Sequence, residues 1–277
     1  MKYAKKIFRV TTYNIKISMS DVKFYLLLLL ISIFIYDYMK DIISFSDSVN
    51  YKISPWSFPL LFNQKYMRCI INIGVLLLFC DTPVINQNYY YIISRSGENC
   101  WIISQTLYIF FMSGLYYLFI FIISILINIS HVEFTTEWGK VFQTLGSGYN
   151  IGYKTYTSSL IIHYFSPLQA TFFTFLLNWL SSSLIGIIIS SCNMILKGKI
   201  NGIIISSFLV FFDLFVVYFP RLSWFSPVTW SNLECIKISN NSDLPSITFI
   251  IFMYILSILF IFIFNLFYHQ KNKFEID

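Results

Sequence analysis

The stretch FCDTPVINQNYYYIISRSGENCWIISQ, residues 79–105, decides the fold class of this chain. It follows the apolar run INIGVLLL (71–78) and precedes the longer apolar run TLYIFFMSGLYYLFIFIISILI (106–127). Both runs are apolar enough to lie in a bilayer, whereas the stretch between them carries acidic, basic, tyrosine, proline and glycine residues. This arrangement predicts two membrane helices joined by a short, patterned connection at the membrane surface.

The composition of the whole chain supports this membrane assignment. Of its 277 residues 57% are hydrophobic and only 12% are charged, and the mean hydropathy is +0.68, whereas a soluble domain carries about 25% charged residues. In a membrane protein the excess of basic residues behind the net charge of +6 indicates how the chain is oriented in the membrane. No nucleic-acid partner is expected. The five cysteines form no metal spacing with the three histidines, so we expect neither a disulfide framework nor a metal site.

Six apolar blocks are candidates for membrane-spanning helices, since about 20 apolar residues cross the ~30 Å hydrocarbon layer. They comprise residues 24–39, 62–80, 101–127, 168–196, 200–219 and 247–268. The second block is the weakest because Lys65 and Arg68 lie in its first turns. Backbone groups in lipid must bond internally, which favours helices. We therefore predict an all-α integral membrane protein, with residues 1–277 as one domain and residues 24–268 as a six-span bundle.

Basic residues predict how the bundle is oriented. Segments 1–23, 81–100, 197–199 and 269–277 hold eleven lysines and arginines, whereas the longer intervening loops hold six. Because basic residues accumulate on the cytoplasmic side, both termini, including the tail 269–277, are expected in the cytoplasm. The predicted location is a bacterial plasma membrane, which the chain crosses several times in contact with membrane lipid.

Residues 1–23 are predicted to form a helix in the membrane interface. Phe8, Thr12, Ile15 and Met19 recur at helical spacing, with Lys5, Arg9 and Lys16 elsewhere on the helix. A solvated basic tail is the alternative.

Segment 81–97 shows the signs of a short amphipathic helix. Asp81 or Thr82 would cap it with Pro83 in its first turn, and Gly97 would stop it after Arg95. Trp101 would then anchor the following span at the interface. A capped helix held between two spans would act as a lever, and an ordinary connecting loop is the alternative.

This segment resembles the connection between the second and third spans of bacterial ABC transporter permeases of the type-2 exporter class. The shared features are the Asp-x-Pro at 81–83, the Arg-x-Gly at 95–97 and the tryptophan before the third span; SPVTWSNL (226–233) resembles the outer loop before the last span of these permeases. Glu98 and Asn99 depart from the basic residues that are common there.

The resemblance implies a permease subunit that forms a homodimer or a heterodimer with a second permease. It also implies that such a subunit would be driven by a separate cytoplasmic ABC ATPase, which would bind the ATP, so this chain would need no cofactor of its own. The implied contact residues for that ATPase are Asp81, Pro83, Tyr89, Tyr90, Arg95 and Gly97. An exporter is implied more than an importer, and the sequence does not identify the cargo.

No ATPase or other catalytic motif accompanies this pattern. GSGYNIGYKT (146–155) imitates a phosphate-binding loop, but its glycine spacing is wrong and Tyr153 precedes the lysine. The chain has no HExxH or GxSxG motif, so we expect that it is not an enzyme. An intramembrane enzyme and a non-transporting sensor or accessory subunit are the alternatives.

Two outer loops have features of their own. Phe134, Trp138 and Leu145, together with Val141 or Phe142, share one helical stripe and predict a helix on the outer membrane surface. The proline- and tryptophan-rich segment 220–236 either dips back into the outer leaflet or forms a plain aromatic loop.

Asp213 and Arg68 are predicted to form an ion pair. Asp213 lies roughly 20 Å along the fifth span from its inner end, at 1.5 Å per residue, and Arg68 and Lys65 lie at similar depth in the second. A charge at this depth needs a partner, and Arg68 is a better candidate than Lys65. A packing role and a role in gating or cargo contact both remain open.

Overall fold

The computed structural model describes residues 2–85, 88–149, 157–198, 200–216, 218–237 and 244–271. These residues form an all-α fold, which confirms the predicted class, with one isolated β-bridge between Ile53 and Val132. The α-helices are α1 (Lys2–Ser20), α2 (Val22–Val49), α3 (Phe58–Leu61), α4 (Lys65–Phe79), α5 (Tyr89–Ser96), α6 (Glu98–Leu126), α7 (Gly139–Gly146), α8 (Ser159–Tyr164), α9 (Pro167–Ile195), α10 (Asn201–Val216) and α11 (Ile247–Lys271). Three short 3₁₀ helices, η1 (Pro220–Phe225), η2 (Thr229–Ser231) and η3 (Leu233–Cys235), precede α11.

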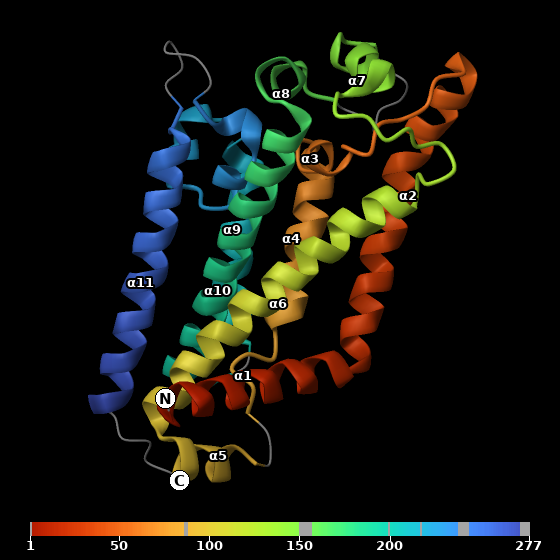
Figure 1. Ribbon diagram of the computed structural model, residues 1–277. Helices are drawn as coiled ribbons and strands as arrows, with labels where there is room; N and C mark the ends of the chain where they lie inside the picture. Colours follow the sequence, from red (N-terminus) through yellow and green to blue (C-terminus); the bar gives the residue numbers. More distant parts are fainter. Residues whose placement is uncertain are drawn as a thin grey trace.

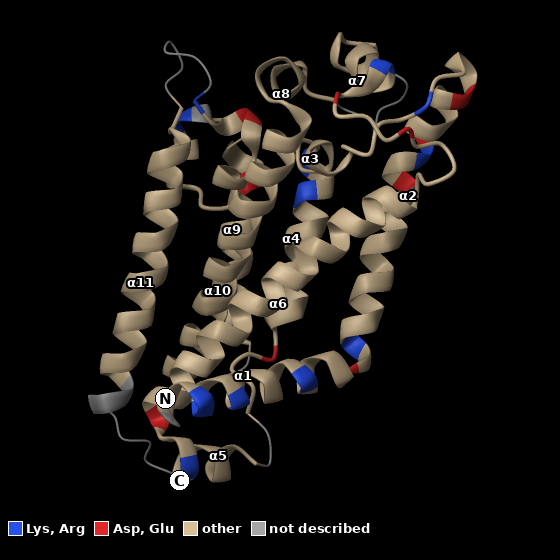
Figure 2. Ribbon diagram, viewed as in Figure 1, with Lys and Arg blue, Asp and Glu red and all other residues tan. Residues whose placement is uncertain are grey.

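The long helices run between two ends of the molecule (Figure 1). Helices α2, α4, α9, α10 and α11 extend lengthwise, and α6 crosses them obliquely. Helix α1 lies across one end with α5 below it, and α3, α7 and α8 lie at the opposite end. We call these the α1 end and the α7 end. The lysines and arginines of α1 and α5 lie at the α1 end (Figure 2).

Four helices of the described chain are long and apolar enough to cross a membrane, namely α2, α6, α9 and residues 247–268 of α11. The chain is therefore a multi-pass membrane protein. Helices α4 and α10 have only 15 and 16 residues, or roughly 22–24 Å at 1.5 Å per residue, which is less than the ~30 Å hydrocarbon layer. These four helices confirm that several blocks form membrane-crossing helices, whereas the crossing of the membrane by α4 and α10 stays a prediction.

Capping residues explain where the first two blocks depart from their predicted bounds. Helix α2 begins after Asp21, whose carboxylate accepts the Lys23 backbone N–H, and continues to Val49, ten residues past the predicted end at 39. Asn50, in the left-handed region, caps its end. The predicted block 62–80 is interrupted before Lys65 because Phe62 ends the buried helix α3. The second block therefore consists of a turn at 62–64 and the helix α4, and α3 lies just before it.

Small residues let α4, α6 and α9 pack closely in the core. A Cβ at Gly186 of α9 would lie 2.6 Å from Ile109 Cγ2 and 2.9 Å from Phe79 Cδ2. The hydroxyls of Ser113 and Ser183 are 2.8 Å apart in the same region. Close approach through glycine and serine is typical of helices packed in a membrane, where a larger side chain would separate the backbones.

Helix α1 forms as predicted, but a different face packs on the bundle. Thr11 and Asn14 are buried, whereas Phe8 and Met19 of the predicted apolar stripe are exposed. The Ser104 hydroxyl of α6 donates to the Ile7 carbonyl at 3.2 Å. Hydroxyl contacts with Ser104 therefore help to hold α1 on the bundle. Of the predicted stripe, Phe8 and Met19 lie away from the packing face, whereas Ile15 packs against the core.

The predicted surface helix at 134–145 is shorter and more deeply packed than expected. Helix α7 begins only at Gly139, because Trp56 Nε1 donates to the Thr135 carbonyl at 2.7 Å and Ser54 Oγ to the Trp138 carbonyl at 2.7 Å. Trp138 is buried and Phe134 is exposed. The segment covers the α7 end of the bundle. Of the predicted loop at 146–155, residues 150–155 lie outside the described residues.

The segment between α10 and α11 folds inward against the helices. Trp230 is buried and its Nε1 donates to the Ser223 carbonyl at 2.7 Å. The Tyr254 hydroxyl of α11 donates to the Pro227 carbonyl, and Asn178 Nδ2 of α9 donates to the Ser231 carbonyl at 3.4 Å. Residues 228–233 therefore pack on the bundle, and both predicted alternatives for the segment, a dip into the outer leaflet and a plain aromatic loop, stay predictions.

Candidate functional site

Segment 81–97 lies at the α1 end and joins α4 to α6. Its helix α5 begins at Tyr89, with Asn88 as the N-cap residue, so the prediction of a helix capped by Asp81 or Thr82 is wrong. Residues 81–85 are non-helical, and 86–87 lie outside the described residues. The reason is that the polar groups of the first part bond to other helices instead of closing a first turn.

Three contacts fasten residues 81–84 to the bundle. The Asp81 carboxylate pairs with the Lys23 ammonium of α2 at 2.9 Å. The Thr82 carbonyl accepts from Asn193 Nδ2 of α9 at 2.7 Å, and the Val84 N–H donates to Gln105 Oε1 of α6 at 3.3 Å. The beginning of the segment is thus tied to α2, α9 and α6 at once.

An aromatic contact holds α5 against α6. Tyr89 is buried, and its ring meets the buried Trp101 ring edge-on with centroids 5.1 Å apart. Burial, followed by the neighbouring Tyr90 and Glu98, raises the pKa of Tyr89 to about 12, so its hydroxyl stays neutral. Tyr89 thus covers Trp101, and the role of Trp101 as an interfacial anchor of the third span stays a prediction.

Helix α1 also contacts α5. Lys6 Nζ donates to the Arg95 carbonyl at 3.0 Å, and Asn88 Nδ2 donates to the Tyr13 hydroxyl at 3.2 Å. These contacts place α5 directly below α1 (Figure 1). The N-terminal helix and the connecting segment therefore form one layer at the α1 end.

The opposite side of α5 is open to the outside. Its exposed residues are Tyr90, Tyr91, Ser94 and Arg95, which we call the exposed α5 face. Arg95 Nη1 donates to the Tyr91 hydroxyl at 2.5 Å, and its guanidinium lies 5.1 Å from the centre of that ring. Tyrosine and arginine are enriched at protein–protein interfaces and among the residues that dominate binding. The composition of this face is therefore typical of a docking surface.

Gly97 separates α5 from α6 as predicted. Its φ is +89° and its N–H donates to the Ile93 carbonyl at 2.8 Å. This left-handed conformation strongly favours glycine. Gly97 therefore sets the angle between the exposed α5 face and the third long helix.

The six residues that the resemblance implied as ATPase contacts divide into two groups. Pro83 and Tyr89 are buried and so do not reach the surface, whereas Asp81, Tyr90, Arg95 and Gly97 are exposed. The sequence reasoning missed Gln105 and Asn193 as anchors. Both are amides inside long apolar helices, and such a polar residue at membrane depth signals a specific partner.

The second candidate site is a buried ion pair towards the α7 end. Arg68 Nε lies 2.7 Å from Asp213 Oδ2, both side chains are 2% exposed, and this is the pairing that the sequence predicted. Arg68 Nη1 also donates to the Phe62 carbonyl at 3.0 Å, and the Thr229 hydroxyl donates to Asp213 Oδ1 at 2.7 Å. Lys65 instead lies 5.1 Å from the Tyr66 ring centre. The pair joins α4, α10 and η2.

Comparisons with known proteins find no match for the chain, whether among family models, curated proteins or solved structures. Within the described ranges, no three histidine, cysteine, aspartate or glutamate residues gather as metal ligands. The two sites described above are therefore the basis for any functional assignment.

Proposed function

We propose that this chain is the membrane-spanning permease subunit of an ATP-driven ABC transporter, powered by a separate cytoplasmic ATPase that docks on segment 81–97. The observation that carries the proposal is the attachment of the exposed α5 face. Lys23 and Gln105 bond to the start of its segment, Asn193 bonds to Thr82, and Tyr89 packs on Trp101. The exposed α5 face is thus held on α6 through Tyr89, and the start of the same segment is held on α2, α6 and α9.

In this proposal α4 and α10 complete a six-span bundle, and both termini lie in the cytoplasm of a bacterial cell. The basic residues of α1 and α5 at one end of the molecule support this orientation (Figure 2). The partner ATPase binds the ATP. The permease works as a homodimer or with a second permease, exports its cargo, and performs no catalysis itself.

The buried pair Arg68–Asp213 has a structural task in this proposal. It lies towards the α7 end, which the basic asymmetry assigns to the outer side, and it connects α4 to α10 and to the inward-folded η2. Both charges have further hydrogen-bond partners, as a stable buried pair requires. The pair would hold the outer part of the bundle together while the α1 end responds to the ATPase.

The decisive experiment is purification of the tagged full-length chain from its native membranes, followed by mass spectrometry of the proteins that remain bound. The proposal expects a soluble subunit with a Walker nucleotide-binding loop. Its retention should fall when the exposed α5 face is changed by Arg95→Glu. Recovery of the chain with no such ATPase would favour the alternative of a sensor or accessory subunit.

A further inference from the structure

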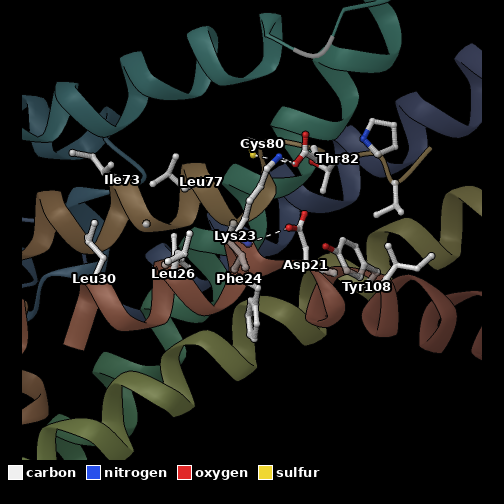
Figure 3. A pocket seen from close by; sticks show the side chains of 18 of the residues that line it. Asp21, Lys23, Phe24, Leu26, Leu30, Ile73, Leu77, Cys80, Thr82 and Tyr108 are labelled. Atoms are coloured by element: carbon white, nitrogen blue, oxygen red, sulfur yellow. Dashed lines mark hydrogen bonds and ion pairs between the residues drawn. The ribbon is translucent and has the colours of Figure 1, made fainter. Parts of the chain in front are cut away.

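An apolar groove runs between α2 and α4 towards the α1 end. Leu26 and Leu30 of α2 face Ile73 and Leu77 of α4 across it (Figure 3). The groove encloses about 730 Å³, which lies within the ~300–1,000 Å³ typical of small-ligand sites. It is large enough to hold an extended hydrocarbon chain.

The sides of the groove are open to the surroundings. Leu26, Leu30, Ile73 and Leu77 are between 36% and 60% exposed. Because α2 is one of the candidate membrane spans, the medium beside it is bilayer hydrocarbon. The occupant that this surface fits along its length is therefore the tail of a lipid, drawn from the membrane itself.

Charged groups lie at the α1 end of the same groove. Lys23 and Asp81 form the 2.9 Å ion pair, with side chains 68% and 58% exposed, and Asp21 accepts the Lys23 backbone N–H at 3.0 Å. Ser18, Thr82 and Tyr108 add uncharged polar groups. The mouth thus holds one ammonium group and two carboxylates, while the rest of the groove is apolar.

This charge arrangement discriminates between lipid headgroups. A headgroup with only a negative charge would find one favourable ammonium and two unfavourable carboxylates. A headgroup that carries both a phosphate and an ammonium meets an opposite charge with each. The long, exposed Lys23 side chain is able to reorient, since surface ion pairs of this kind are weakly held.

We propose that the groove binds one acyl chain of a membrane phospholipid with a zwitterionic headgroup, the phosphate at Lys23 and the ammonium at Asp21 and Asp81. The apolar channel and the mixed charges at its mouth carry this proposal together. It requires only that α2 lies in the membrane, and it is independent of the partner that drives the protein and of any transported cargo.

The acyl-chain part is tested with the purified full-length chain by native mass spectrometry during titration with phosphatidylethanolamine. Leu30→Trp and Ile73→Trp fill the groove from its two walls. Each should weaken lipid binding about tenfold, the equivalent of a modest steric penalty. Leu29→Trp is the matched control, because Leu29 is exposed on α2 but does not line the groove, and it should leave binding unchanged.

The headgroup part compares phosphatidylethanolamine with phosphatidylglycerol. The zwitterionic lipid should bind about threefold more tightly, and Lys23→Gln should weaken it about threefold, as expected for an exposed charge contact. Lys16→Gln, an exposed lysine of α1 outside the groove, is the control. Unfolding temperatures of all variants are measured to separate lost binding from lost folding.

Three results would overturn the proposal. The first is an equal loss of lipid in Leu29→Trp and in the two groove variants. The second is equal affinity for both phospholipids together with no effect of Lys23→Gln. The third is a purified chain that retains detergent but binds neither phospholipid in the titration, which would mean an adventitious additive only.

Discussion

The Arg68 guanidinium and the Asp213 carboxylate lie 2.7 Å apart and almost fully buried, although 145 positions separate them in the chain. Arg68 also bonds to the Phe62 carbonyl, and Asp213 accepts from the Thr229 hydroxyl. Each charge is therefore paired and further hydrogen-bonded. Such an arrangement is costly to break from one side only, because the remaining charge stays buried without its partner.

Arg68→Gln and Asp213→Asn should each destabilise the protein by about 3–5 kcal/mol, the usual cost of an orphaned buried charge. The double variant should lose less than the sum of the two, since no charge is then left alone. Thermal unfolding in detergent measures all three. Lys65→Gln is the control and should have little effect, and strictly additive losses would show that the two charges do not stabilise each other.

The exposed α5 face and its buried side should respond differently to substitution. Arg95→Glu and Tyr90→Ala should each reduce retention of the ATPase about tenfold or more, as residues that dominate an interface do, with little change in unfolding temperature. Tyr89→Ala should lower the unfolding temperature, because it uncovers Trp101. Retention that is unchanged in both face variants would remove α5 as the docking site.

Asn193 should be the most sensitive of the amide anchors. Its Nδ2 donates to the Thr82 carbonyl at 2.7 Å and its Oδ1 accepts the Gly202 N–H at 2.8 Å, both in buried surroundings. Asn193→Leu should cost about 1–3 kcal/mol for the polar groups left unpaired. Asn201→Ala removes a more exposed amide contact and should change stability by less than about 0.5 kcal/mol. Equal effects of the two, measured by unfolding, would contradict the anchoring role.

Single cysteines should report opposite sides of the membrane. Ser48 near the end of α2 and Ser94 on α5 are both exposed and lie at opposite ends of the molecule. In a background without the native cysteines, an impermeant thiol reagent applied to intact cells should label Ser48→Cys. It should label Ser94→Cys only after the membrane is opened. The reverse pattern would place segment 81–97 outside the cell, where no ATPase reaches it.

The sequence predicts the long helices well because their signal is strong and local. The blocks at 101–127, 168–196 and 247–268 correspond closely to α6, α9 and α11, since an apolar run of that length has no other stable state in lipid. The pairing of Arg68 with Asp213 was also predictable, because isolated charges at similar depth in two apolar blocks restrict the choice of partner.

The helix in segment 81–97 was placed too early for a reason that sequence spacing does not contain. An aspartate two residues before a proline reads as a helix start, but the Asp81 carboxylate pairs with Lys23, and the Thr82 carbonyl bonds to Asn193. These partners are 58 and 111 positions away. Contacts of this range also explain why Trp101 is covered and why α7 begins after the residues bonded to Ser54 and Trp56.

Helix α4 carries an ion pair near each of its ends, with Asp81 just beyond its last turn joined to α2 and Arg68 in its first turn joined to α10. Its 15 residues make it a rod of roughly 22 Å with a pinned joint at each end. The joint at the α1 end is wet and weak, whereas the other is dry and strong. If this rod tilts, the exposed Lys23–Asp81 pair breaks first and the buried Arg68–Asp213 pair serves as the pivot. The displacement is then largest at the α1 end, where segment 81–97 begins.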